Sequence, residues 1–394
     1  MKIHFAKLVW LFNILLISAC NQIPGVQIVI PVPTPTVLET GAPESTLYRA
    51  DAARSGVYQM PALPDLHGVK WQKSFAEDAY FPMYADGTLY IGTANGSLLA
   101  LDPQSGEERW SYDVGDGPIL AVAVANGFIY FGAGSSGFYA LSIGDGTLAW
   151  SFETDGSVWS SSPLVADDHA YFGSDTGRVY ALDLTTQKTA WTFRAASGVL
   201  WQVAGDAEQI YVPTQNYLYA LDRDTGAEIW RASTSDKWNA PAVANRVVFA
   251  GNGDRQFIAF DAETGKERWS FMAPFTQWSE WSAPVITANT VYVGYSNNTM
   301  YAFDAKTGEE QWQFQTEDWA TTDPILAEDV LYFGVGAHAN LAQPTEDRDF
   351  YALNAKTGEP IWTFKADGLV YAAATLGEDV VYFKTLNNIL YALH

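Results

Sequence analysis

Apolar positions in this chain come in short runs that are bounded by turn residues. Leu89–Gly92 and Leu98–Leu101 form one pair of such runs, and Leu331–Gly334 is another of the same kind. Runs of this length, rich in Leu, Ile, Tyr and Phe and bounded by Gly, Asn or Asp, are typical of β-strands joined in hairpins. The pattern therefore favours many short strands over long helices.

A turn signature follows these strand pairs and recurs seven times. It consists of a short polar residue, a Gly four positions later and a Trp four positions after that. The copies are Asp102…Gly106…Trp110, Ser142…Gly146…Trp150, Asp183…Gln187…Trp191, Asp222…Gly226…Trp230, Asp261…Gly265…Trp269, Asp304…Gly308…Trp312 and Asn354…Gly358…Trp362. The polar side chain accepts hydrogen bonds from nearby backbone amides, and Gly adopts the positive φ that the turn requires. Gln187 replaces Gly in one copy, which predicts a strained or remodelled turn there.

The Trp of each copy is expected to lie on the outermost strand of its unit and to pack against the neighbouring unit. The Trp lies an even number of residues after the Gly, and side chains alternate along a strand, so every Trp points to the same face. Trp71 is an eighth residue of this kind, although no Asp–Gly turn precedes it. The predicted structural set is Trp71, Trp110, Trp150, Trp191, Trp230, Trp269, Trp312 and Trp362.

The two ends of the repeat region complement each other. Val380–Phe383 and Ile389–Leu393 match the second and third strands of a unit, and the chain stops at His394, where other copies begin their turn. The segment around Trp71 supplies the missing fourth strand. Residues 71–394, divided among eight units, give about 40 residues each, the size of a propeller blade. The sequence therefore predicts an all-β, eight-bladed β-propeller of four-stranded antiparallel blades, closed by an N-terminal strand that completes the last blade.

These units resemble the pyrroloquinoline-quinone-type repeat, whose pattern is Ala-x-Asp-x-x-Thr-Gly-x-x-x-Trp. Ala220–Trp230 and Ala302–Trp312 match it throughout, and Leu47–Asp51 with Arg54–Gly56 looks like the leader found before such propellers. The resemblance covers residues 46–394. For the dehydrogenases of this family it implies a quinone at the channel, held between a Trp and a disulfide of adjacent cysteines, with calcium and a catalytic Asp nearby.

The connections between blades hold most of the remaining aromatic residues. In an up-and-down blade, these connections lie on the face opposite the Asp–Gly turns. Many carboxylates share the connections, so an acidic, aromatic funnel is expected at the channel mouth, suited to a sugar, a cation or an extended peptide. Packing between blades is the alternative role for the same rings. The candidate ligand- or partner-binding residues are Trp159, Trp201, Trp238, Trp278, Trp281, Trp319 and Tyr371.

The N-terminus has the pattern of a bacterial lipoprotein. Lys2 and Lys7 flank a short apolar core that ends in Ile17-Ser-Ala-Cys20. This resembles a lipobox, so residues 1–19 are predicted to be a signal peptide and Cys20 to carry the lipid. Residues 20–45 contain prolines at alternate positions and are predicted to be a tether, which leaves residues 46–394 as the propeller domain. The prediction is an exported protein, anchored by lipid to a bacterial membrane, at the outer membrane or the cell surface.

Composition narrows the functional classes. The formal net charge of −23 argues against a nucleic-acid partner, because phosphate recognition requires clustered Lys and Arg. The single cysteine excludes an intrachain disulfide, so pyrroloquinoline quinone with calcium is disfavoured but not excluded. The histidines are scattered among blades without ligand spacing, so no metal site is expected. No catalytic residues are assigned.

Two classes of function remain after this reasoning. The first is a non-catalytic binding or scaffold lipoprotein, a monomeric propeller with a protein partner in the envelope. It is similar to the propeller lipoproteins of the machinery that inserts β-barrel proteins into the outer membrane. The second is a quinoprotein dehydrogenase or a glycan-binding sensor that uses the aromatic face. Fold resemblance alone does not separate them.

Overall fold

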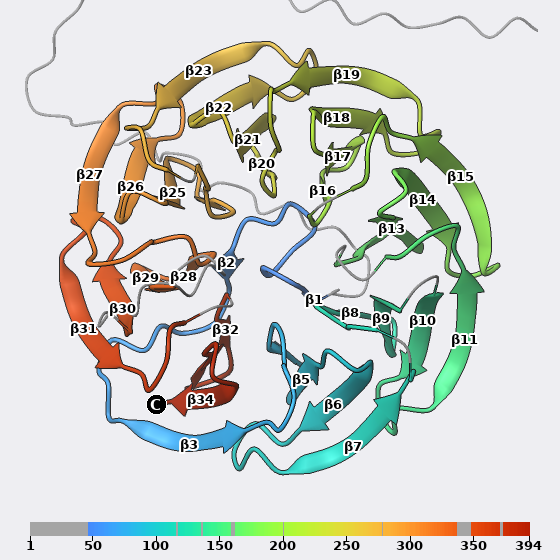
Figure 1. Cartoon of the computed structure of the whole chain (residues 1–394), viewed down its shortest axis with the longest axis horizontal. Helices are drawn as coiled ribbons and strands as arrows, with labels where there is room; N and C mark the ends of the chain where they lie inside the picture. The colour runs from blue at the N-terminus through green and yellow to red at the C-terminus, as the bar shows by residue number, and fades with distance from the viewer. Residues whose placement is uncertain are drawn as a thin grey trace, which may run out of the picture. The chain divides into compact units, whose positions relative to one another are not determined.

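The computed structural model describes residues 46–394 except 116, 135–136, 159–161, 200, 278, 337–347 and 371–372. Eight antiparallel sheets stand in a ring around a central channel (Figure 1). The predicted eight-bladed propeller is thereby confirmed. The predicted signal peptide, the predicted lipidation site Cys20 and the predicted tether all lie outside the described residues.

Each blade has four strands, which are ordered from the channel to the rim. From blade one to blade eight, the innermost strands are β4 (Met83–Ala85), β8 (Ala123–Ala125), β12 (Leu164–Ala166), β16 (Ala204–Gly205), β20 (Ala242–Ala244), β24 (Val285–Ile286), β28 (Ile325–Ala327) and β32 (Thr375–Leu376). The second strands are β5 (Thr88–Gly92), β9 (Phe128–Ala133), β13 (His169–Gly173), β17 (Gln209–Pro213), β21 (Val247–Gly251), β25 (Thr290–Tyr295), β29 (Val330–Gly334) and β33 (Val381–Lys384).

The outer half of each blade carries the signature. The third strands are β6 (Ser97–Leu101), β10 (Gly137–Ser142), β14 (Arg178–Asp183), β18 (Tyr217–Asp222), β22 (Gln256–Asp261), β26 (Thr299–Asp304), β30 (Asp349–Asn354) and β34 (Ile389–Leu393). The outermost strands are β7 (Glu108–Asp113), β11 (Leu148–Glu153), β15 (Lys188–Arg194), β19 (Glu228–Ser233), β23 (Glu267–Met272), β27 (Glu310–Gln315), β31 (Pro360–Lys365) and β3 (Val69–Ser74). Two further short strands, β1 (Thr46–Leu47) and β2 (Val57–Tyr58), lie in the channel.

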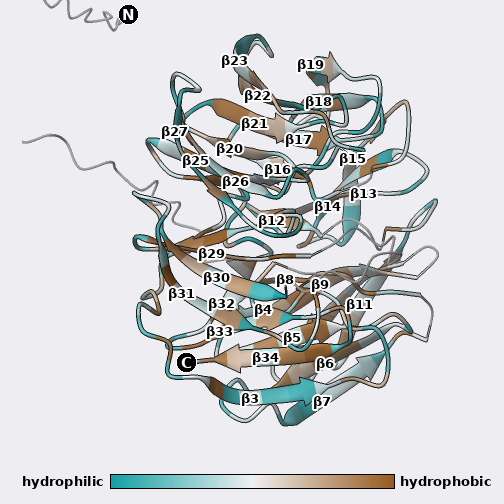
Figure 2. Ribbon diagram, turned by 60° about the vertical axis from the view of Figure 1, so that its left-hand side comes forward, coloured by the Kyte–Doolittle hydropathy of each residue, from teal (hydrophilic) through white to brown (hydrophobic). Residues whose placement is uncertain are grey.

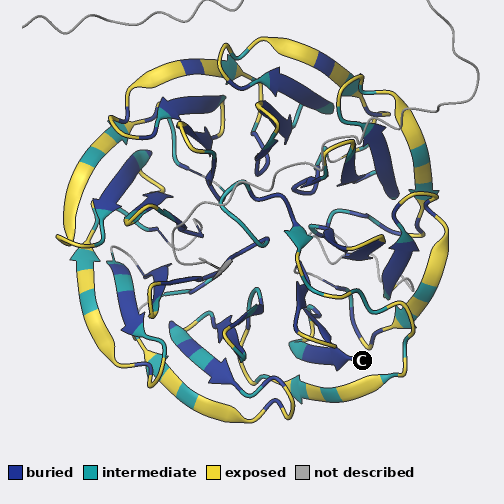
Figure 3. Ribbon diagram, turned by 180° about the vertical axis from the view of Figure 1, so that it is seen from behind, coloured by how far each residue is buried: buried dark blue, intermediate teal, exposed yellow. Residues whose placement is uncertain are grey.

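Residues become more buried from the rim toward the channel. The three inner strands of each blade are almost entirely buried, whereas the outermost strands alternate exposed and half-buried positions (Figure 3). Hydropathy shows the same division, with apolar inner strands and polar outer loops (Figure 2). Ring pairs join neighbouring blades, since Phe138 stacks on Phe172 and Phe350 on Phe383, each with centroids 4.3 Å apart. The core is therefore a series of interfaces between blades.

The signature Trp contacts the following blade through a hydrogen bond and through packing of its ring. The indole N–H of Trp230 donates to the Ala262 carbonyl at 2.7 Å, within the turn of the following blade. A Cβ added to Gly265 of that turn would lie 2.6 Å from the same ring, so the ring packs directly on the glycine. Trp269 repeats the arrangement, with a bond to Ala305 at 3.0 Å. The repeated Gly thus supplies both a positive φ and room for the neighbouring indole.

The turn with Gln187 keeps the geometry of the others. Gln187 has a φ of 58° and its N–H donates to the Asp183 carbonyl at 2.8 Å, as Gly226 donates to Asp222. The turn is therefore strained but not remodelled, because a residue with a Cβ occupies the left-handed region.

The N-terminal strand closes the ring. β3 pairs antiparallel with β34, from Val69 opposite Leu393 to Ser74 opposite Ile389. The N–H of His67 donates to the His394 carbonyl at 2.6 Å, and the N–H of His394 donates to the Gly68 carbonyl at 3.1 Å. This pairing joins the two ends of the repeat region within one sheet.

Blade eight, which the N-terminal strand completes, buries a lysine at a position where most blades have glycine. At Gly92 and five equivalent positions a Cβ would collide with the next connection; at Gly92 it would lie 2.1 Å from the Ile119 carbonyl oxygen. Blade eight has Lys384 there, 3% exposed and close to Asp78. Burial lowers the pKa of Lys384 from 10.5 to about 8, against the opposing effect of the Asp78 carboxylate.

We expect Lys384→Met to raise the free energy of unfolding at neutral pH, by up to roughly 3 kcal/mol. The folded-state pKa of about 8 lies below the unfolded value of 10.5, so the wild-type protein gains stability as the pH rises between these values. The variant should lose this rise. Urea unfolding across that range measures both effects, with exposed Lys365→Met as the matched control. A wild-type stability that is flat between pH 8 and 10 would contradict the assignment.

Candidate functional site at the channel mouth

A leader, residues 46–58, fills the centre of the ring. β1 pairs antiparallel with β8, and β2 pairs parallel with β28. Between them, leader carbonyls accept hydrogen bonds from the innermost strands of blades four to seven: Ala52 from Gly205, Ala53 from Val243, Ser55 from Ile286 and Gly56 from Leu326, at 2.8–3.0 Å. These inner edges would otherwise present unpaired backbone groups. The leader therefore closes the channel and satisfies the edges.

Two buried arginines hold the leader in place. Arg49 and Arg54 are each 1% exposed. The Arg54 guanidinium donates to four carbonyls, those of Tyr48 (2.6 Å), Ser162 (3.0 Å), Pro163 (3.1 Å) and Val203 (3.0 Å). Arg49 donates to the carbonyls of Pro284 and Pro324. Burial lowers the pKa of Arg54 to about 10.

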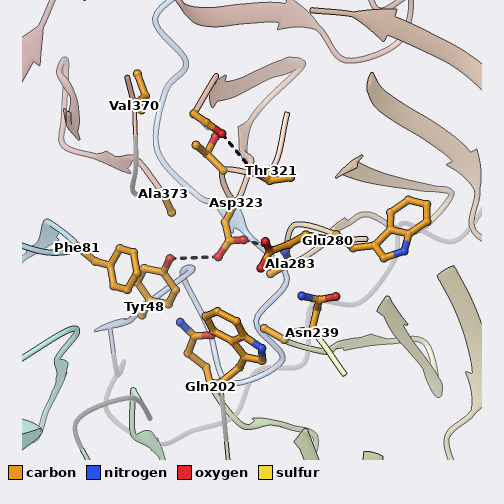
Figure 4. A pocket seen from close by; sticks show the side chains of 15 residues that line it. Tyr48, Phe81, Gln202, Asn239, Glu280, Ala283, Thr321, Asp323, Val370 and Ala373 are labelled. Atoms are coloured by element: carbon orange, nitrogen blue, oxygen red, sulfur yellow. Dashed lines mark hydrogen bonds between the residues drawn. The ribbon is translucent and has the colours of Figure 1, made fainter. Parts of the chain in front are cut away.

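A cavity of about 200 Å³ lies over the leader, on the face of the blade connections (Figure 4). Tyr48 of the leader and Phe81 of the first connection face each other across one side, with ring centroids 5.0 Å apart. The Tyr48 hydroxyl donates to Asp323 at 3.2 Å. The remaining lining residues include Trp201, Gln202, Asn239, Ala240, Glu280, Trp281, Ala283, Thr321, Thr322, Gly336, Val370 and Ala373. Connections from most of the ring thus meet at one cavity.

The two carboxylates of this cavity are both engaged. Asp323 accepts from the Ala283 N–H at 2.7 Å and lies 3.8 Å from the Arg49 guanidinium. Burial and the nearby Asp323 raise the pKa of Tyr48 well above its usual value. Glu280 pairs with Lys237 at 3.1 Å, and the Lys237 ammonium lies 5.9 Å from the centre of the Trp201 ring. The acidic charge of the cavity is therefore balanced locally.

Three polar atoms of cavity-lining residues have no hydrogen-bond partner within the described part of the chain, and protein encloses each of them. They are Oδ1 of Asn239 and the indole nitrogens of Trp201 and Trp281. Asn239 is 3% exposed. Figure 4 shows its amide beside the side chains that enclose the cavity. Such groups are costly to bury unpaired.

The structure separates the aromatic residues predicted at this mouth. Trp201 and Trp281 line the cavity, and Trp319 is half-buried on the same face. Trp238 is 1% exposed and packs on Phe260, so it fills space between strands. Trp159, Trp278 and Tyr371 lie outside the described residues.

Trp281 lines the cavity and is almost fully buried. It is 2% exposed and its ring centroid lies 4.3 Å from that of Tyr295. Packing is therefore its main contribution.

Sequence reasoning missed the polar part of the cavity. Gln202 and Asn239 directly follow Trp201 and Trp238, and Asp323 occupies a comparable place in a later connection. For Gln202 and Asn239, the position next to an aromatic connection residue was the available signal; Asp323, between Thr322 and Pro324, has no such neighbour. In the sequence, Tyr48 is only one residue of the leader motif, and that motif does not indicate that its side chain reaches the mouth of the channel.

A second depression, of about 680 Å³, adjoins the first and shares Glu280 with it. It lies over the connection between blades five and six, and Phe275 is 81% exposed there. Arg255 lies 5.7 Å from the centre of the Phe275 ring. Met272, at the end of β23, is 53% exposed. Exposed large apolar side chains of this kind often mark contact surfaces.

The cationic side chains at the described part of the mouth are already engaged, which disfavours pyrroloquinoline quinone because that cofactor is polyanionic. In the described part of the mouth, Lys237 is paired with Glu280, and Arg49 is committed to leader and blade carbonyls. The leader fills the space beneath. The described residues also contain no cluster of His, Cys, Asp and Glu that could hold a metal ion.

None of the described residues belongs to a helix long and apolar enough to cross a membrane.

Comparisons with known proteins match most of the propeller. A family model described as outer membrane protein assembly factor BamB matches residues 65–192 and 175–322. A second model, described as the β-propeller domain of glucose, ethanol and alcohol dehydrogenases, matches residues 276–388.

Single relatives support the same likeness over shorter segments. BamB of Salmonella typhimurium is 32% identical over 96 residues, which cover 22% of this chain and 24% of that protein. The chain therefore spans about a quarter of the length of that relative.

Two solved structures share the fold. BamB from Moraxella catarrhalis superposes with a TM-score of 0.65 at 18% identity, covering 83% of this chain and 97% of that one. Quinohemoprotein alcohol dehydrogenase from Comamonas testosteroni gives 0.72 at 14% identity, covering 88% and 80%. At these identities the structures show the fold alone. Since the first family model spans well over half of the residues, the chain belongs to the PQQ-repeat propeller family described as outer membrane protein assembly factor BamB.

Proposed function

We propose that this protein is a non-catalytic scaffold of the bacterial envelope, which binds a protein partner on its connection face during assembly of envelope proteins. The observation that carries the proposal is Phe275, 81% exposed at the edge of a depression on that face. Aromatic residues and Arg are both enriched in the buried core of protein interfaces.

The interior of the propeller supports a scaffold over a dehydrogenase. The leader fills the channel with backbone pairs and two buried arginines, and the charges at the mouth are paired. The matching family is described as an outer membrane protein assembly factor, which supports a role in assembly.

Export and lipid attachment at Cys20 remain part of the proposal and rest on the sequence alone. The lipobox-like segment before Cys20 and the Pro-rich residues 20–45 fit a lipid anchor with a tether.

We expect Phe275→Ser to weaken partner binding by about tenfold or more while leaving the unfolding free energy nearly unchanged. The measurement is quantitative co-purification, from envelopes of the host, of the protein that inserts β-barrels into the outer membrane. Leu148→Ser, on the outermost strand of blade two, is the matched control because Leu148 is also exposed, at 44%.

The proposal fails on either of two results. One is that Phe275→Ser retains as much of the barrel-inserting protein as Leu148→Ser does. The other is that the wild-type protein does not retain it at all.

A further inference from the structure

We propose that Arg255 binds an acidic side chain of the protein that docks on Phe275, so that the docking segment carries an Asp or Glu next to an apolar residue. This inference deepens the proposed function and rests on it for the docking surface. Three observations carry it: the backbone conformation of Arg255, the absence of an acidic partner for its guanidinium within the described part of the chain, and its place beside Phe275.

Arg255 occupies a backbone position that disfavours a long side chain. It lies in the turn between β21 and β22 of blade five, with a φ of 70°. Its N–H donates to the Asn252 carbonyl at 3.3 Å, and Gly96, Gly177 and Asn388 form the corresponding bond in blades one, three and eight. Gly and Asn adopt a left-handed φ more readily than Arg does. Backbone strain of this kind clusters at binding sites.

The guanidinium of Arg255 has no ion-pair partner among the described residues. Most other arginines of the blades lie 2.5–3.6 Å from an Asp or Glu oxygen: Arg109, Arg178, Arg194, Arg223, Arg231, Arg246 and Arg268. Arg255 instead makes one long bond, of 3.4 Å, to the Ala273 carbonyl. The chain has 45 acidic and 22 basic residues, so carboxylates without a cation are expected, whereas a half-buried cation without a carboxylate is not.

The neighbouring charges favour an acidic group of a protein over the surface of an anionic membrane. Lys237, the other cation of this depression, is paired with Glu280 at 3.1 Å. Hydrogen-bond donors occupy both oxygens of Asp254, and Asp236 is exposed. These carboxylates, in a chain of net charge −23, are repelled by anionic lipids. A single carboxylate on a protein segment can approach Arg255 without bringing a whole charged surface with it.

The apolar surroundings of Arg255 define the second part of the recognised feature. Phe275 is 81% exposed, and its ring centre lies 5.7 Å from the guanidinium carbon of Arg255. Met272 is 53% exposed and pairs with Gln256, the residue after Arg255. The planar fork of Arg donates two parallel hydrogen bonds to one carboxylate. An apolar side chain packed on Phe275 would exclude water from that ion pair and strengthen it.

The test uses random peptides displayed on phage and selected on the purified full-length protein. We expect enrichment of peptides that carry Asp or Glu beside an aromatic or aliphatic residue. One enriched peptide is then synthesised in its acidic form and as the matching amide, and fluorescence anisotropy measures the affinity of both. The amide should bind the wild-type protein about tenfold or more weakly. Arg255→Ala should bind the two forms with the same reduced affinity.

Arg255→Gly separates binding from stability. Gly suits a φ of 70°, so we expect a melting temperature at or above that of the wild type together with loss of the preference for the acidic peptide. Arg255→Lys keeps the charge but not the fork and should bind the acidic peptide less tightly than the wild type. Arg268→Ala is the matched control, because Arg268 lies on β23 of the same blade, is paired with Asp261 at 2.8 Å and should not affect binding.

Any of four results would overturn the proposal. They are the absence of enriched acidic peptides, equal binding of the acidic peptide and its amide, a melting temperature of Arg255→Gly below that of the wild type, and binding of phosphatidylglycerol vesicles that depends on Arg255. Failure of the proposed function is distinguishable. If acidic peptides bind through Arg255 while the wild-type protein does not retain the barrel-inserting protein, the surface docks a different acidic partner. If that protein is retained through Phe275 and the amide binds as well as the acid, only the role of Arg255 is wrong.

Discussion

Replacing Arg54 with methionine is expected to lower the free energy of unfolding by about 3–5 kcal/mol. Arg54 is 1% exposed and donates to four carbonyls from the leader and from blades three and four. Methionine fills part of the volume but leaves these buried acceptors without donors. It also removes the cation beside Asp51, whose pKa burial raises.

Chemical denaturation measures this loss, and hydrogen exchange shows where it arises. The amides of Gly205 and Val243 donate to leader carbonyls, so they should exchange faster in the variant. Arg109→Met is the matched control. Arg109 also donates to backbone and carboxylate oxygens, but its side chain is 41% exposed, so less than about 1 kcal/mol is expected. Equal effects of the two variants would show that the leader contributes little to stability.

Truncating the blade tryptophan Trp230 to alanine is expected to cost about 3–5 kcal/mol. Trp230 is 8% exposed, donates to the Ala262 carbonyl at 2.7 Å and packs on Gly265 of the next blade. Its loss leaves a void between two blades and an unpaired carbonyl. Urea unfolding followed by circular dichroism gives the difference.

A double-mutant cycle isolates the contact between blades. Gly265→Ala places a Cβ 2.6 Å from the Trp230 ring, at a φ of 67°. The single variant should therefore be destabilised by collision and by backbone strain, on the order of 1–3 kcal/mol. In the double variant the collision disappears, so its cost should be smaller than the sum of the two single costs. Strict additivity would mean that the ring does not pack on this glycine in solution.

The repeated pattern was sufficient to predict the architecture. The spacing from polar residue to Gly to Trp is local, and its seven copies, with Trp71 as an eighth Trp, specify eight similar blades whatever their partners. The C-terminal strands without a turn, together with Trp71, predicted the closing strand, and β3 pairs with β34 as expected. Gln187 was predicted to disturb its turn, and the turn is strained without being remodelled.

The site depends on contacts that no local pattern contains. Arg54 binds the carbonyls of Ser162 and Val203, 108 and 149 residues away in sequence, so the filled channel follows only from ring closure. The sequence alone grouped Trp201 and Trp238 as similar connection residues. Only the packed blades decide that Trp201 lines a cavity whereas Trp238 is covered by Phe260.

The sequence by itself determined the blade count, the closure and the face on which connections gather, because strand alternation and turn chemistry act over a few residues. The tertiary structure alone decided which side chains on that face are buried, paired or free. Exposure of Phe275 and the unpaired amide oxygen of Asn239 depend on how neighbouring blades pack around each connection. That packing joins residues distant in sequence, and the proposed function of this protein depends on it.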